Sequence, residues 1–120
     1  YLTQGDVRSV QLAKAALRAG METLMDEMHV SYDDVRRVAL AGGFGAHLSA
    51  ASAARIGLVP AALEHKVDLL GNAAGKGAAA ALFPEGRAAL ESVAASCSHV
   101  ELSTSAAFAA HYLDAMGFEP

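Results

Sequence analysis

Apolar residues recur every three or four positions in the first part of the chain. They form one stripe, made up of Val10, Ala13, Leu17, Met21, Leu24 and Met28. This spacing predicts a long amphipathic helix over about residues 4–29, begun by the capping-box-like sequence Thr3-Gln4-Gly5-Asp6. The opposite face carries Lys14, Arg18, Glu22 and Asp26. We expect that polar face to be solvated or to face a ligand, and the apolar stripe to need cover.

Two short apolar runs follow, and each ends in glycine. Residues 37–41 precede Gly42-Gly43, and residues 67–70 precede Gly71-Asn72. Short continuous apolar runs are typical of buried parallel strands. Because parallel strands place their carboxyl ends at one edge of a sheet, we expect the two glycine turns to lie side by side, where α/β sheets bind ligands.

The rest of the chain is mainly helical in pattern. It predicts helices at about residues 49–56, 73–82 and 84–98, a short edge strand at 99–102, and a last helix capped by Ser103-Thr104-Ser105 and ending at Met116-Gly117. The result is an α/β fold with short parallel strands and packed helices. Since a parallel sheet normally needs several strands, we infer that further strands come from sequence outside residues 1–120.

Charge and composition exclude several functions. The net charge of −4 comes from scattered residues, which leaves no basic stripe for nucleic acid or anionic lipid. No apolar run reaches the ~20 residues of a membrane span, and the first residues lack the order of a signal peptide, so a cytoplasmic location is expected. The single Cys97 excludes an internal disulfide and an iron-sulfur cluster held by this chain alone, and we interpret it as a small buried hydrophobe.

The first glycine turn, Gly42-Gly43-Phe44-Gly45, provides the first group of candidate binding residues. Glycine permits a positive φ, which we expect at Gly43, and lets the backbone approach a ligand closely. Neither familiar phosphate loop fits the two turns, because Gly71 and Gly75 have one residue too few between them for a P-loop and Gly42 to Gly45 lacks the dinucleotide spacing. The second group of candidates is Gly71, Asn72 and Gly75. We predict no catalytic residue, and no metal site, because the histidines lack close ligand spacing.

Several motifs in a fixed order make the sequence resemble a known family. They are Gln11-Leu12-Ala13-Lys14-Ala15-Ala16, Leu40-Ala41-Gly42-Gly43-Phe44-Gly45, Arg55-Ile56-Gly57-Leu58, Gly71-Asn72-Ala73-Ala74-Gly75, Gly77-Ala78-Ala79 and Glu101-Leu102-Ser103-Thr104. Together they resemble the C-terminal part of the ASKHA-fold ATPases that reductively activate corrinoid proteins. The resemblance implies that residues 1–120 are a single domain, a C-terminal fragment of an RNase H-like, actin-like second lobe.

The resemblance also implies a function and a set of partners. Gly42-Gly43 matches the family's adenosine motif, and Gln11 and Lys14 match a helix face that borders adenine in the related chaperones. ATP and magnesium would bind to the longer protein, whose first lobe holds the phosphates, and its ferredoxin-like N-terminal domain would carry the iron-sulfur cluster. The expected partner is a corrinoid protein. The fragment alone should be inactive and should self-associate as a dimer, through its open strand edges.

Two other interpretations remain open at this point. The same lobe occurs in small-molecule kinases of the superfamily, whose acceptor site would lie in sequence outside this chain. Alternatively, the glycine turns are structural and the chain is a non-enzymatic interaction or dimerisation module.

Overall fold

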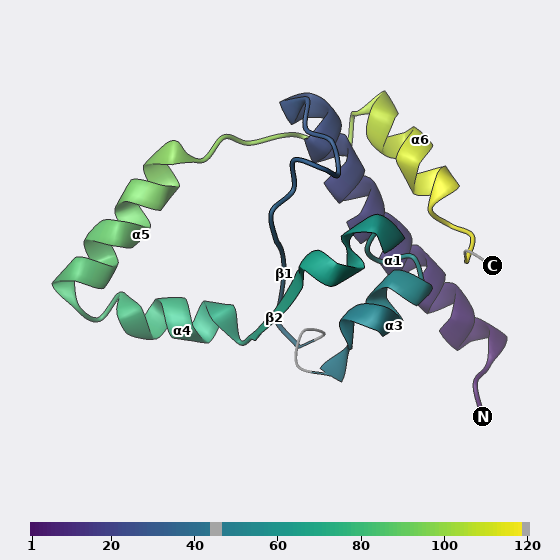
Figure 1. Ribbon diagram of the computed structural model, residues 1–120, viewed down its shortest axis with the longest axis horizontal. Helices are drawn as coiled ribbons and strands as arrows, with labels where there is room; N and C mark the ends of the chain where they lie inside the picture. The colour runs from purple at the N-terminus through teal and green to yellow at the C-terminus, as the bar shows by residue number, and fades with distance from the viewer. Residues whose placement is uncertain (44–46, 119–120) are drawn as a thin grey trace.

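The computed structural model describes residues 1–43 and 47–118, and it joins two parallel strands to packed helices (Figure 1). The elements are α1 (Gln4–Met28), β1 (Val38–Ala41), α3 (Ala50–Arg55), the 3₁₀ helix η1 (Ala61–Lys66), β2 (Val67–Gly71), α4 (Ala73–Ala80), α5 (Pro84–Ser96) and α6 (Ala106–Asp114). The α/β class is confirmed, and so are the main predicted helices and both central strands.

Helix α1 begins where the sequence predicts. The Asp6 amide donates to Thr3 Oγ1 at 3.2 Å, and the Thr3 amide donates to Asp6 Oδ2 at 2.9 Å, which completes a capping box. Hydrogen bonds from the Thr3 side chain and backbone lower the pKa of Asp6. The helix ends at His29, which takes a left-handed conformation with φ 54°. Neither α1 nor any other described helix has the length and apolar character needed to cross a membrane.

The two strands form a parallel pair whose carboxyl ends meet. Val38 lies opposite Val67, and the register shifts near the end so that Ala41 lies opposite Gly71. The Gly42 amide then donates to the Gly71 carbonyl at 2.8 Å, which extends the ladder into the turns. The prediction that the two glycine turns lie at the same edge of one sheet is confirmed.

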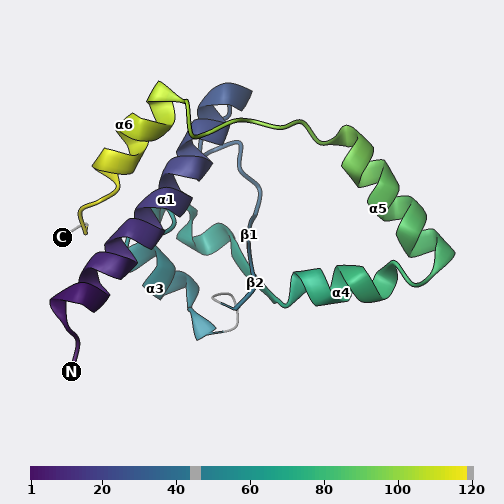
Figure 2. The ribbon, with the colours of Figure 1, turned by 180° about the vertical axis from the view of Figure 1, so that it is seen from behind.

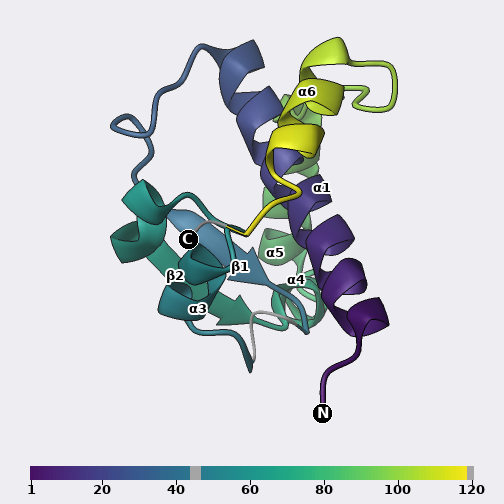
Figure 3. The same cartoon turned by 90° about the vertical axis from the view of Figure 1, so that its right-hand side faces the viewer.

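The core beneath this sheet is small. Its buried members are Ala53, Leu58, Val59 and Leu63, from α3, the following turn and η1. Side chains of both strands pack against this cluster, among them Val38, Leu40 and Val67. Helix α3 and η1 lie on one side of the strand pair, as Figure 3 shows. The 3₁₀ helix was not predicted from the sequence.

Helix α1 buries a different face from the one that its pattern suggests. Its buried residues are Lys14, Ala15, Ala19 and Thr23, and α6 packs along this helix (Figures 1 and 3). Small side chains on this face let the two helices approach closely. The apolar stripe is left open, since Leu17 is 55% exposed and Met28 is 70% exposed. The stripe therefore still needs cover, as expected. On the polar face Asp26 is exposed, but Lys14 is buried, so a fully solvated face is wrong, and the alternative that this face meets a ligand stays a prediction.

An apolar groove of about 460 Å³ runs between α1 and β1. Its lining includes Leu17 and Met21 from α1 and residues 39–41 of β1, and its floor is Leu48, Leu58 and Val59. Within the described residues, β1 pairs only with β2, so the edge of β1 away from β2 offers its backbone groups for further pairing.

Helices α4 and α5 extend away from the rest of the structure as an arm (Figures 1 and 2). Neither helix contains a buried residue. Leu82, Phe83, Leu90 and Val93 are exposed apolar side chains of the arm. Gly86 is needed at its bend, because a Cβ there would overlap the Ala80 carbonyl.

Two predictions about the chain after α5 are wrong. Residues 99–102 form no strand but part of an extended connection to α6 (Figure 2), because no described strand lies beside them. Cys97 is exposed rather than buried, because α5 ends at Ser96 and no other element covers that end.

The open edge and the exposed arm lead to a prediction for the isolated 120-residue chain. It should form concentration-dependent dimers or larger species, because each large apolar side chain left exposed forgoes about 1.5–3 kcal/mol of burial. Sedimentation velocity over a range of concentrations would measure this. If the arm forms part of the dimer contact, Phe83→Asp should weaken the association. Arg87→Asp is the control for the change of charge and should weaken it less. A compact monomer at every concentration would contradict the prediction.

Candidate functional site

The first glycine turn leaves open space beside its backbone. Gly42 takes φ 88°, a conformation that other residues rarely adopt, and its amide is held by the Gly71 carbonyl. Gly43 does not have a positive φ, so that expectation is wrong, and a Cβ placed on it would meet no described atom within 4 Å. Phe44 and Gly45 lie outside the described residues. The turn therefore combines one constrained glycine with one that is open to a close neighbour.

The second glycine turn is built around a helix cap. Gly71 takes φ 61°, and Asn72 Oδ1 accepts a hydrogen bond from the Gly75 amide at 2.8 Å, which caps α4. The Asn72 side chain lies so close that a Cβ on Gly75 would sit 2.6 Å from its Nδ2. Lys76 Nζ donates to the Leu70 carbonyl at 3.1 Å. Asn72 and Gly75 thus shape the turn and place the N-terminus of α4 at the edge shared with Gly42.

Gln11 and Lys14 contact a different part of the chain. Gln11 Nε2 donates to the Met116 carbonyl at 3.3 Å, and Lys14 Nζ donates to the Gly117 carbonyl. Lys14 is only 4% exposed, and its ammonium lies 5.0 Å from the centre of the Phe118 ring. The structure therefore brings these two residues to the segment after α6 rather than to the glycine turns.

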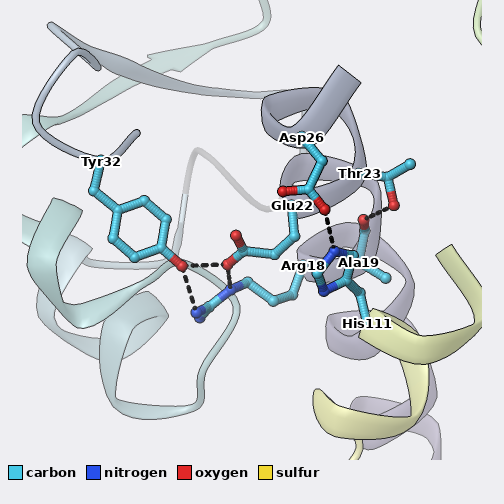
Figure 4. A network of polar contacts seen from close by, with 7 residues as sticks. All are labelled: Arg18, Ala19, Glu22, Thr23, Asp26, Tyr32 and His111. Carbon is cyan, nitrogen blue, oxygen red and sulfur yellow. Dashed lines mark hydrogen bonds and ion pairs between the residues drawn. The ribbon is translucent and has the colours of Figure 1, made fainter. Parts of the chain in front are cut away.

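Arg18 and Glu22, one helical turn apart, form an ion pair, and a third residue joins them (Figure 4). Arg18 Nε donates to Glu22 Oε1 at 2.6 Å and Arg18 Nη2 to Tyr32 Oη at 3.2 Å, while the Tyr32 hydroxyl donates to the same Glu22 oxygen. Burial, followed by the hydrogen bond to Glu22, raises the pKa of Tyr32. Tyr32 was missed in the sequence because a single tyrosine in a polar connection carries no spacing signal.

These residues line a polar pocket of about 350 Å³ between α1 and α6. Its lining is Lys14, Arg18, Glu22, Tyr32, Gly57, His111, Asp114, Ala115 and Gly117. His111 Nε2 lies 2.7 Å from Asp26 Oδ2 and ties α6 to α1 (Figure 4). Nothing in the local pattern predicted His111 as a partner for Asp26, since 85 residues separate them.

Two parts of the structure carry groups of the kind that ligands use. The glycine turns place backbone groups at the end of the strands, and the polar face of α1 carries amide and ammonium donors, which the segment after α6 engages. Among the described residues, no group of three or more His, Cys, Asp or Glu side chains could hold a metal ion.

Comparison with known proteins gives two matches. Over residues 1–120 the sequence matches the family described as the C-terminal domain of RACo, the ASKHA domain. It is also 34% identical over 113 residues to the corrinoid activation enzyme RamQ of Eubacterium limosum. That alignment covers 93% of this chain and 19% of the relative, so the chain spans a small part of the relative's length.

The crowding of Gly75 by Asn72 predicts strong coupling between the two positions. Asn72→Ala should cost about 1 kcal/mol because the cap is lost. Gly75→Ala should also destabilise, because the new Cβ displaces the capping side chain. In the Asn72→Ala background, however, Gly75→Ala should stabilise by up to about 1 kcal/mol through helix propensity. Urea unfolding of wild type, the two single variants and the double variant measures the free energy of unfolding of each. Additive effects of the two substitutions would contradict the close contact between Asn72 and Gly75.

The raised pKa of Tyr32 predicts a loss of stability at alkaline pH. The neutral phenol is favoured in the fold, so its contribution is complete below the unfolded tyrosine pKa of about 10 and is lost as pH rises towards the folded value. Tyr32→Phe should cost about 1 kcal/mol at neutral pH, and this difference should shrink above pH of about 10. The difference in tyrosinate absorbance between wild type and Tyr32→Phe, followed as a function of pH, gives the titration midpoint of Tyr32. A midpoint at or below that of the unfolded chain would refute the prediction.

Proposed function

The chain belongs to the family of C-terminal ASKHA domains represented by that of RACo, and from this premise we propose that it is the nucleotide-binding part of an ATP-dependent reductive activator of corrinoid proteins. Its task is to contribute contacts to adenosine. The relative is named a corrinoid activation enzyme, which supports this choice of activity. The chain covers only a small share of the relative, which supports the proposal that other parts of a longer protein carry out the remaining steps.

The observation that carries the proposal is the meeting of the two glycine turns. The Gly42 amide and the Gly71 carbonyl are 2.8 Å apart, so both turns present their backbone at the same edge. Open space beside Gly43 leaves room for a ribose or a base to lie against the chain. Ligands of open α/β sheets bind at this edge, beyond the carboxyl ends of the strands.

The polar face of α1 supplies the second part of the proposed site. Gln11 and Lys14 already donate hydrogen bonds to carbonyl oxygens, and the ring nitrogens of adenine are acceptors of the same kind. Phe44 and Gly45 follow the first glycine turn directly in the sequence and complete the proposed set with Gly71, Asn72 and Gly75.

The remaining chemistry is assigned to the rest of the longer protein. Its other lobe would hold the triphosphate and magnesium, and its iron-sulfur domain would supply the electron that reduces the corrinoid. This chain brings no cluster ligands of its own beyond Cys97. Hydrolysis by the isolated chain is therefore not expected. A lobe of a small-molecule kinase would use the same fold, and the relative's name favours the corrinoid activator over it.

A substitution at Gly43 tests the proposed contact without straining the fold. In the intact protein that contains this chain, Gly43→Val should weaken ATP binding at least about tenfold, or 1.4 kcal/mol, because its branched side chain fills the space needed by the ligand. Gly43→Ala is the graded control and should weaken binding less. Calorimetry gives the affinities, and thermal unfolding should change little since Gly43 has no positive φ and no described neighbour. Unchanged affinity in Gly43→Val would remove the functional role of this turn.

A further inference from the structure

The segment after α6 lies on the helix face that the proposed function assigns to adenine. The Met116 carbonyl accepts from Gln11, the Gly117 carbonyl accepts from Lys14, and the Phe118 ring lies over the Lys14 ammonium. These three consecutive residues, Met116 to Phe118, are called the C-terminal clasp below. With the clasp in place Lys14 is 4% exposed, and the clasp occupies its ammonium.

The clasp offers the same chemistry as a purine. A purine presents ring nitrogens that accept hydrogen bonds and an aromatic face that attracts cations. The clasp presents two carbonyl acceptors and one aromatic ring to the same two donors, Gln11 and Lys14. We propose that the clasp is an internal occupant of the adenine-binding face, and that an adenine nucleotide binds by displacing it. This inference rests on the proposed function, because it assigns Gln11 and Lys14 to the same site.

The surroundings of the clasp fit a segment that can leave without unfolding the core. None of the residues of α6 is buried, and Phe118 is 44% exposed. The sheet core of Leu58, Val59 and Leu63 makes no use of the clasp. Segments with few buried apolar contacts open at low free energy, well below that of global unfolding.

The pocket beneath the clasp supports a ligand of this size. Gly117 and Gly57 both form part of its wall, and a Cβ on Gly57 would lie 3.1 Å from Lys14 Nζ. The volume of about 350 Å³ falls at the lower end of the range of small-molecule sites, about 300–1,000 Å³. Release of the clasp would open this pocket from the side of Lys14.

A clasp of this kind lowers the apparent affinity for nucleotide. The measured dissociation constant is the intrinsic one divided by the fraction of molecules with the clasp open. Weakening the clasp raises that fraction, so a substitution outside the binding machinery should tighten binding. A purely structural role for the Phe118 ring predicts the opposite sign or no effect.

The test compares ATP affinity in the intact protein, measured by calorimetry, for wild type, Phe118→Ala and Phe118→Tyr. Loss of the ring over Lys14 in Phe118→Ala should tighten ATP binding by about three- to tenfold. Phe118→Tyr keeps the aromatic face and should bind like wild type. Hydrogen exchange supplies a second readout, because saturating ATP should speed exchange of the Gly117 and Phe118 amides in wild type.

The outcomes separate this inference from the proposed function. If Gly43→Val weakens ATP binding but Phe118→Ala leaves it unchanged or weaker, the glycine turns bind nucleotide and the clasp is structural. The clasp inference also fails if ATP slows exchange at Gly117 and Phe118. If wild type binds no adenine nucleotide, both the proposed function and the inference fail.

Discussion

The hydrogen bond from the Gly42 amide to the Gly71 carbonyl is the contact on which the proposed site depends. It continues the parallel ladder past the last strand residues and holds two turns, far apart in sequence, at one edge. Both residues take a positive φ at this contact, a conformation that only glycine adopts readily. Asn72 then caps α4 beside the same edge, so helix, turn and strand pair are fixed together.

A second constraint is the burial of a polar helix face. Burial of these polar side chains is tolerated because each is hydrogen-bonded. Lys14 donates to a backbone carbonyl, and Arg18, Glu22 and Tyr32 bond to one another. The same helix leaves Leu17 open beside the free edge of β1. The chain thus completes its polar contacts internally and leaves apolar surface for a neighbour, which accords with its match to one domain of a much longer relative.

Local signals in the sequence were sufficient for most of the elements. Thr3 and Asp6 marked the start of α1, and the glycines after two apolar runs marked the strand ends, because capping and positive φ depend on adjacent residues. The contact of Lys14 with Gly117 could not be predicted, since the two residues are 103 positions apart in the sequence and their contact depends on how α6 docks. The exposure of Cys97 and the missing strand at 99–102 likewise depend on which elements lie alongside.

The central proposal is that an adenine nucleotide is bound both at the edge of the two glycine turns and at the polar face of α1. The most direct measurement is photolabelling of the intact protein with an azido-adenine analogue of ATP, followed by peptide mapping and competition with ATP. The account predicts that the label falls on the peptide carrying Gly42 and Gly43 and on the peptide carrying Gln11 and Lys14. Labelling confined to other peptides, or labelling that ATP does not compete away, would contradict it.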